Sequence, residues 1–182
     1  PALALVQARW GHLNPGGNFL TRAQVRLLDA HFRVEQEARF RLGLPVPFNG
    51  TCGVWRRAAI LDAGGWQGDT LTEDLDLSLR ARLRGWRSAY LNDVLVPGVL
   101  PESAQAWRAQ QFRWSKGFVQ CAIKLSPLVW RSDALPLWQR VMVTLQMAQP
   151  LAFLVGLACT LLGLPIIAGA VVASPELTRL AV

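Results

Sequence analysis

The feature that most constrains this chain is the stretch Val141–Pro175, which contains no charged residue. It is longer than the roughly 20 apolar residues that an α-helix needs to cross a lipid bilayer. Because a proline disrupts a helix, Leu164-Pro165 predicts a break between two helices. We expect one membrane span at about 141–163 and the start of a second at about 166–174. A helical hairpin buried in a soluble core is the alternative interpretation.

The charge of the chain lies almost entirely before this stretch. The formal net charge is +7, and after Arg140 the only charged residues are Glu176 and Arg179. A basic segment beside a membrane span predicts the cytoplasmic side of a membrane. It also suits a lipid bilayer with anionic headgroups or a phosphate-bearing substrate. The arginines are scattered and no nucleic-acid-binding signature accompanies them, so we expect no nucleic-acid partner.

The cysteines and histidines predict neither a disulfide framework nor a metal site. Cys52, Cys121 and Cys159 are odd in number and widely spaced. His12 and His31 have no partner at the spacing of metal ligands, so both are predicted to be ordinary polar residues.

The first residues look like a strand already inside a domain. The chain opens on PALALVQARW without an initiator methionine, and residues 2–6 are apolar. We therefore expect a piece of a longer protein, with further sequence before Pro1 and after Val182.

Hydrophobic spacing predicts two long helices separated by shorter elements. Residues 21–42 carry apolar side chains at helical spacing, with Thr21 as a possible N-cap. Residues 86–96 predict a strand. A helix over residues 104–125 is predicted to end at Ser126-Pro127.

The stretch TEDLDLSLR, residues 72–80, places three carboxylates close together. Thr70 and Glu73 match a capping box, so acids in the first helical turn have an ordinary structural explanation. Asp74 and Asp76 lie about 200° apart around a helix, so they are poorly placed to chelate one metal. The apolar stripe of this helix is Leu75, Leu79 and Leu83. The pattern leaves open whether one of the acids is a catalytic base.

One face of the later helix gathers groups suited to sugar or phosphate. Gln110, Arg113, Trp114 and Gly117 lie at i, i+3, i+4 and i+7, so they project together. A tryptophan offers a flat apolar face to a sugar ring, and an arginine makes bidentate contacts to phosphate oxygens. A membrane-surface helix with its basic side chains extended toward water explains the same pattern equally well.

Several short blocks in order resemble processive family 2 glycosyltransferases. They include FNGT (48–51), TED (72–74) and QQFRW (110–114). AGGW, RGW and LP stand between them in the same order. The likeness is greatest to the cellulose synthase-like mannan and glucomannan synthases and to bacterial β-glucan synthases.

The resemblance implies an α/β fold: part of a GT-A glycosyltransferase domain, followed by transmembrane α-helices. Residues 1–126 would be the acceptor-side half of that catalytic domain. Residues 127–140, with Trp130 and Trp138, would lie at the membrane interface. Residues 141–182 would form the transmembrane region.

The resemblance also implies roles for individual residues. Asp74 would be the catalytic base that takes the proton of the acceptor hydroxyl, with the helix dipole lowering its pKa. Residues implied to bind acceptor or donor are Thr72, Glu73, Gln110, Arg113, Trp114, Phe48, Asn49, Gly50 and Thr51. A Mg²⁺ or Mn²⁺ cofactor is implied, with its ligands mainly upstream of this chain and none within it.

The implied activity is that of a membrane-bound inverting hexosyltransferase. It would move a hexose from a nucleotide-sugar, UDP-glucose or GDP-mannose, to the end of a growing β-linked polysaccharide. This chain alone would be inactive. The alternatives are transfer of a single sugar to a lipid, as in ceramide glucosyltransferases, and a non-catalytic membrane scaffold of the same fold. The high Arg, Ala and Leu content indicates a GC-rich bacterium. The expected location is a bacterial inner membrane, spanned several times, with the catalytic part facing the cytoplasm.

Overall fold

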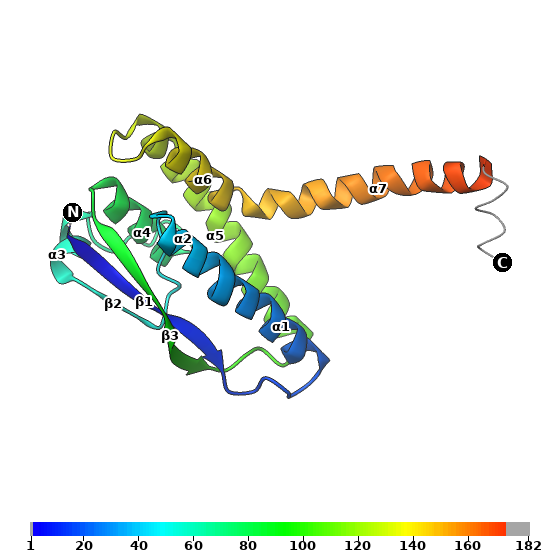
Figure 1. Ribbon diagram of the computed structural model, residues 1–182, viewed down its shortest axis with the longest axis horizontal. Helices are drawn as coiled ribbons and strands as arrows, with labels where there is room; N and C mark the ends of the chain where they lie inside the picture. The colour runs from blue at the N-terminus through cyan, green and yellow to red at the C-terminus, as the bar shows by residue number, and fades with distance from the viewer. Residues whose placement is uncertain (1, 174–182) are drawn as a thin grey trace. The chain divides into compact units, whose positions relative to one another are not determined.

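The computed structural model describes residues 2–173 of the chain. The chain divides into two units at Met147–Ala148, and the described part of each unit is treated by itself. Among the described residues, the first unit holds the three strands and most helices, and the second holds one long apolar helix (Figure 1).

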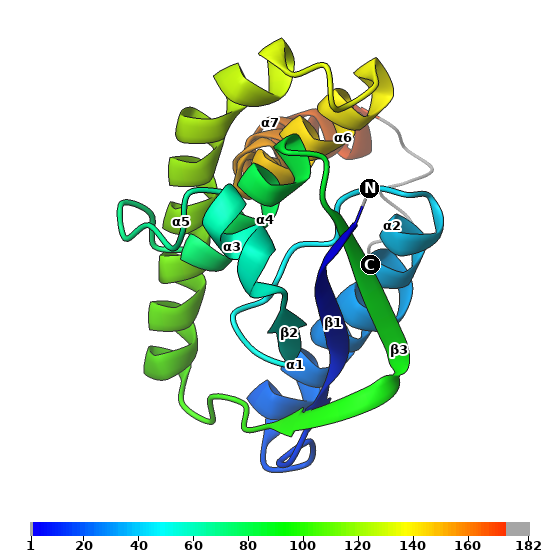
Figure 2. The same ribbon diagram turned by 90° about the vertical axis from the view of Figure 1, so that its left-hand side faces the viewer.

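The first unit is built on a mixed three-stranded sheet with the order β2-β1-β3. The central strand β1 (Leu3–His12) pairs antiparallel with β2 (Gly53–Trp55) and parallel with β3 (Arg87–Gly98). Figure 2 looks onto the sheet, with α1 and α2 behind β1 and β3. The sheet packed with helices confirms the predicted α/β class.

The expected helix 21–42 is divided into three parts. These are α1 (Phe19–Asp29), the π-helical segment η1 (Ala30–Gln36) and α2 (Glu37–Arg41). The N-cap is Asn18 and not Thr21, because the Asn18 side chain accepts a hydrogen bond from the Thr21 backbone N–H at 2.9 Å. The Thr21 hydroxyl in turn accepts from the Asn18 backbone N–H at 2.9 Å, so Thr21 is the third helical residue of a capping box.

The next helices carry the apolar core of the unit. Helix α3 (Arg57–Asp62) precedes α4 (Glu73–Leu83), α5 (Ala104–Arg131) and α6 (Leu137–Met147). The predicted leucine stripe of α4 packs against α5 and α6. This core cluster contains Leu75, Leu79, Cys121, Leu125, Val129, Leu135, Val143 and Met147, with Leu83 beside it.

Helix α5 does not end at Ser126-Pro127 but continues to Arg131. Pro127 is exposed, so water can satisfy the carbonyl that has lost its N–H partner within the helix. The turn after it buries Val129 in the core, which favours continuation of the helix.

The start of the charge-free stretch belongs to the first unit. Val143 and Met147 lie four residues apart on one face of α6 and are buried in the core described above. The expected span at 141–163 therefore begins with residues packed inside the protein. That residues 127–140 lie at a membrane interface remains a prediction.

The second unit contains α7 (Gln149–Ala173). Its residues Gln149–Ile166 are long and apolar enough to cross a membrane by length and composition. The predicted break at Leu164-Pro165 is wrong, because α7 continues through Pro165. A proline removes one backbone donor, and apolar helices of this kind tolerate that loss. Residues 166–173 thus extend the same helix, and residue 174 of the expected second span lies outside the described residues.

Candidate functional site

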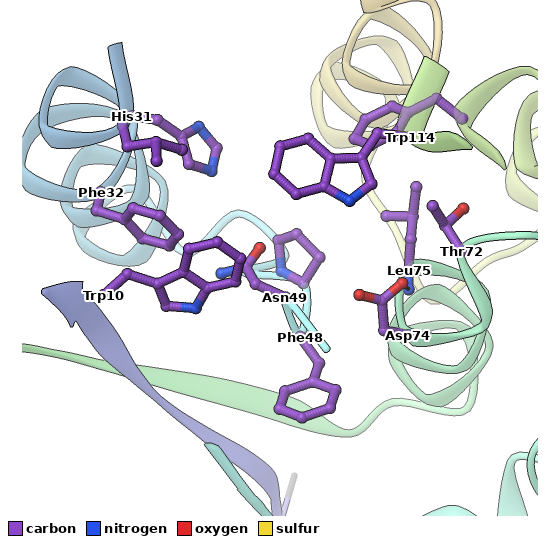
Figure 3. A pocket seen from close by; sticks show the side chains of 12 residues that line it. Trp10, His31, Phe32, Phe48, Asn49, Thr72, Asp74, Leu75 and Trp114 are labelled. Atoms are coloured by element: carbon purple, nitrogen blue, oxygen red, sulfur yellow. Dashed lines mark hydrogen bonds between the residues drawn. The ribbon is translucent and has the colours of Figure 1, made fainter. Parts of the chain in front are cut away.

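A cavity in the first unit brings together the FNGT, TED and QQFRW blocks. Figure 3 shows Trp10, His31, Phe32 and Asn49 on one side and Asp74 and Trp114 on the other. The lining residues come from β1, α1, η1, the loop after α2, the start of α4 and the middle of α5. They are Trp10, Leu28, His31, Phe32, Pro47, Phe48, Asn49, Thr72, Asp74, Leu75, Trp114 and Phe118.

Asp74 is both a helix-terminus residue and a cavity residue. Helix α4 begins at Glu73 with Thr72 as its N-cap, so the predicted capping box between Thr70 and Glu73 is not formed. Asp74 Oδ1 instead accepts a hydrogen bond from the Leu75 backbone N–H at 2.8 Å. The carboxylate therefore satisfies a free donor of the first turn while it lines the cavity.

Burial raises the pKa of Asp74 to about 6, above its usual value of 3.8. The predicted lowering by the helix dipole is therefore wrong. Loss of solvation is the largest cause and outweighs the hydrogen bond from the Leu75 N–H, while the negative charge of Glu73 raises the pKa further. A carboxyl with this pKa is mostly ionised at neutral pH and is more basic than an ordinary aspartate, which suits proton abstraction.

The FNGT loop lies close to the Asp74 carboxylate. Gly50 has a φ of +76°, which favours glycine, and a Cβ added there would lie 3.2 Å from Asp74 Oδ2. The loop is anchored by buried Gln7 on β1, whose amide donates to the carbonyls of Thr51 and Cys52 and whose Oε1 accepts from the Asn49 backbone N–H. The glycine therefore allows the close approach of loop and carboxylate.

Thr51 and Gln110 lie around an adjoining hollow. This hollow shares Trp10, Leu28 and Trp114 with the cavity, so the two spaces meet at these side chains. Its lining comes from β1, α1, the loop after Gly50, the end of β3 and α5. It contains Trp10, Gly11, His12, Leu28, Thr51, Cys52, Val96, Pro97, Gly98, Val99, Leu100, Pro101, Gln110 and Trp114.

Three residues predicted for the site lie outside both linings. Gly50, Glu73 and Arg113 are exposed to solvent and line neither the cavity nor the hollow. Their predicted binding roles remain predictions. Trp114, one residue after Arg113, does line both spaces.

Gly117 positions the start of α4 against α5. A Cβ added to Gly117 would lie 2.5 Å from Thr72 Cγ2 and 2.9 Å from Thr72 Cβ. Both residues are buried, and the Thr72 hydroxyl also lies 3.4 Å from Cys121 Sγ. The group for which Gly117 makes room is therefore Thr72, two residues before Asp74.

We expect Gly117→Ala to destabilise the protein by about 1–3 kcal/mol, because the added methyl overlaps a buried β-branched side chain. Relieving the overlap should also move Thr72 and with it Asp74. Thermal unfolding of the complete protein measures the loss of stability. Gly163→Ala is the matched control, since no atom lies within 4 Å of the added Cβ. Equal behaviour of the two variants would contradict the close fit at Thr72.

Asp76 faces away from Asp74, as helical periodicity predicts, and is fully buried. Its Oδ2 accepts from Arg80 Nε at 2.8 Å, and Lys124 Nζ lies 2.9 Å from Oδ1. Lys124 also binds Asp69 and Gln67, at 2.8 and 2.7 Å. Asp76 is thus the centre of an ion network that joins α4 to α5. Within residues 2–173, no three His, Cys, Asp or Glu side chains gather in a position to hold a metal ion.

Sequence reasoning did not assign several residues of the cavity wall to the site, among them Trp10, His31 and Phe32. Trp10 stacks on Phe32 with ring centroids 5.0 Å apart and lies 6.3 Å from the Trp114 ring. His31, predicted to be an ordinary polar residue, lines the cavity. The π-helical turn of η1 was not visible as a pattern, although such turns often occur at functional sites.

Comparisons with known proteins agree with the motifs. The family described as "Glycosyl transferase family group 2" matches residues 1–172. Over 143 residues the chain is 46% identical to "Glucomannan 4-beta-mannosyltransferase 2" of Arabidopsis thaliana, covering 79% of this chain and 27% of that protein. It is 43% identical over 143 residues to "Probable glucomannan 4-beta-mannosyltransferase 9" of Oryza sativa subsp. japonica, with the same coverage. The chain thus spans about a quarter of the length of these curated relatives.

A solved structure shares the fold. "Mannosyltransferase PcManGT from Pyrobaculum calidifontis in complex with GDP-Man and Mn2+" matches with a TM-score of 0.54 and 16% identity. The match covers 98% of this chain and 50% of that one, which supports the predicted GT-A fold. The curated relatives above are plant proteins, so they do not support the bacterial source inferred from composition.

Proposed function

Because the chain belongs to glycosyl transferase family group 2, we propose that it forms the acceptor side of a membrane-bound inverting hexosyltransferase. The enzyme moves a hexose from a nucleotide-sugar to the end of a growing β-linked polysaccharide. The observation that carries this proposal is Asp74, a half-buried carboxylate with a pKa raised to about 6, in a cavity walled by tryptophans and the FNGT loop.

The reaction is a single displacement. The terminal hydroxyl of the acceptor attacks C1 of the donor sugar as the bond from C1 to the diphosphate oxygen breaks. Asp74 takes the hydroxyl proton, and the nucleoside diphosphate leaves with the bonding electrons. Inversion at C1 follows from one displacement, so no protein nucleophile is needed.

Within residues 2–173 the side chains do not offer a ligand set for a divalent cation. The carboxylates of α4 diverge, and Asp76 is already neutralised by Arg80 and Lys124. We place the ligands of the implied Mg²⁺ or Mn²⁺ outside this chain. Arg113, exposed on α5, is retained as a proposed contact to the donor diphosphate.

GDP-mannose is the donor that we favour, with UDP-glucose as the second candidate. The relatives that cover most of this chain are named glucomannan mannosyltransferases. The long apolar helix α7 supports a bilayer as a partner of the enzyme. Transfer of one sugar to a lipid remains the alternative activity, since it needs the same base and leaving group.

The test is to express the complete enzyme in membrane vesicles and to supply each labelled donor separately. We expect GDP-mannose to give a product that lengthens with time, resolved by chain length. Vesicles without the enzyme are the control. A labelled lipid carrying a single sugar would favour the alternative. Absence of product from both donors would contradict the proposed function.

A further inference from the structure

The cavity wall opposite Asp74 contains polar atoms that are buried and lack a hydrogen-bond partner among the described residues. In the wall they are Trp10 Nε1 and Asn49 Nδ2, and a third such atom, Gln36 Oε1, belongs to a residue that contacts Asn49 from outside the lining. Burying a donor or acceptor without a partner costs free energy, so a cluster of such atoms beside a cavity needs an explanation. A ligand that supplies the missing partners provides one.

These groups are held in place by a chain of contacts behind the wall. Gln36 Nε2 lies 3.4 Å from both Asn49 Oδ1 and His31 Nε2. His31 Nδ1 lies 2.7 Å from Glu35 Oε2, and Arg39 donates to Glu35 at 2.9 Å. The hydrogen bond from His31 is the largest cause that lowers the pKa of Glu35 to about 2, so this carboxylate stays ionised and orients the imidazole. The wall is thus organised before a ligand arrives.

The other surfaces of the cavity are aromatic. Trp10 is stacked on Phe32, and its ring lies 6.3 Å from the ring of Trp114 across the cavity (Figure 3). Trp114 and Phe118 of α5, with Leu28 and Leu75, complete an apolar surround. A ligand for this space therefore needs a flat apolar face and a polar edge.

The charge of the lining excludes a phosphate group as the ligand. The cavity residues include no lysine or arginine, and its ionisable members are His31 and the acidic Asp74. A diphosphate beside Asp74 would meet a like charge without a cation from this wall. A neutral sugar ring presents C–H groups to tryptophan and hydroxyl groups to Trp N–H, amide and imidazole groups.

We propose that Trp10 and His31 form, with Asn49, the wall that binds the hydroxyl groups of the terminal acceptor hexose and directs one hydroxyl toward Asp74, and that Gln36 holds this wall in place. This inference rests on the proposed function and extends it to three residues that the motifs do not contain. Trp10 and His31 contact the sugar, and Gln36 is a positioning residue that orients Asn49 and His31.

The first test is Trp10→Phe in the complete enzyme, which keeps an aromatic ring against Phe32 but removes the Nε1 donor. With mannohexaose as acceptor, we expect the acceptor KM to rise about three- to tenfold, the effect of one lost hydrogen bond. The KM for GDP-mannose should not change. Trp86→Phe is the matched control, because its Nε1 already donates to Asp62 at 2.7 Å, away from the cavity lining.

A pair of variants at His31 tests acceptor binding independently, in case Trp10→Phe folds poorly. His31→Ala should raise the acceptor KM, and His31→Gln, which retains an amide donor, should recover part of the loss. Unchanged acceptor KM values, or equal rises in donor and acceptor KM, would overturn the inference. Wild-type enzyme that extends mannohexaose with neither donor would instead contradict the proposed function.

Discussion

Replacing Asp74 with Asn is expected to lower the turnover of the complete enzyme by about 10²- to 10⁴-fold, the usual contribution of a positioned base. The amide oxygen can still accept the hydrogen bond from the Leu75 N–H, but it cannot take a proton from the acceptor. Polymer formation from labelled donor in vesicles measures the loss. Asp133→Asn, at an exposed aspartate between α5 and α6, is the control and should retain turnover.

The same assignment fixes two further properties of the enzyme. With a pKa of about 6 for Asp74, wild-type kcat/KM should fall about tenfold for each pH unit below 6 and level off above it. Because the folded state raises this pKa, the ionised carboxylate disfavours folding above pH 3.8, and Asp74→Asn should be at least as stable as wild type at pH 7. Near-normal turnover in a folded Asp74→Asn variant would disprove the assignment of Asp74 as the base. Its remaining role would be to accept the hydrogen bond at the start of α4.

Asp76→Ala is expected to cost about 3–5 kcal/mol of unfolding free energy, because it leaves two cations without their buried partner. Arg80 and Lys124 are themselves mostly buried and lie 2.7 and 2.9 Å from the Asp76 carboxylate. Arg80 also donates to the carbonyls of Ala63 and Gly65, so the loop before α4 should loosen too. Thermal unfolding of the solubilised enzyme measures the change.

Asp69→Ala is the matched control for the ion network. It removes the other carboxylate that binds Lys124, at 2.8 Å compared with 2.9 Å for Asp76, but the Asp69 side chain is 58% exposed. Solvent screens such a pair, so we expect a much smaller loss of unfolding free energy than for Asp76→Ala. Equal losses of unfolding free energy for the two variants would show that the burial of Asp76 does not increase the stabilisation by the ion network.

Asp74 and Asp76 show what the local sequence pattern predicts about the site and what it does not. Helical geometry alone separates Asp74 from Asp76, and the structure accordingly places one in the cavity and the other in the ion network. The direction of the Asp74 pKa shift did not follow from the same geometry. The helix dipole is a local feature, whereas the burial that outweighs it comes from the FNGT loop and α5, distant in sequence.

The predicted helix boundaries were wrong where a local sequence rule competed with tertiary packing. Pro127 and Pro165 predict helix ends, yet α5 and α7 continue through them. In α5 the core position of Val129 favours another turn more than the missing donor opposes it. Thr70 and Thr21 matched cap patterns, but the caps are Thr72 and Asn18.

By itself, the sequence determined the family, through ordered motifs, the α/β class and the leucine stripe of α4. These are properties of near neighbours along the chain, which helix and strand periodicity govern. Only the tertiary structure decided that Thr72 lies against Gly117 and that Trp10 and His31 face Asp74. Contacts between residues tens of positions apart depend on how whole elements pack, and the periodicity within one element does not predict that packing.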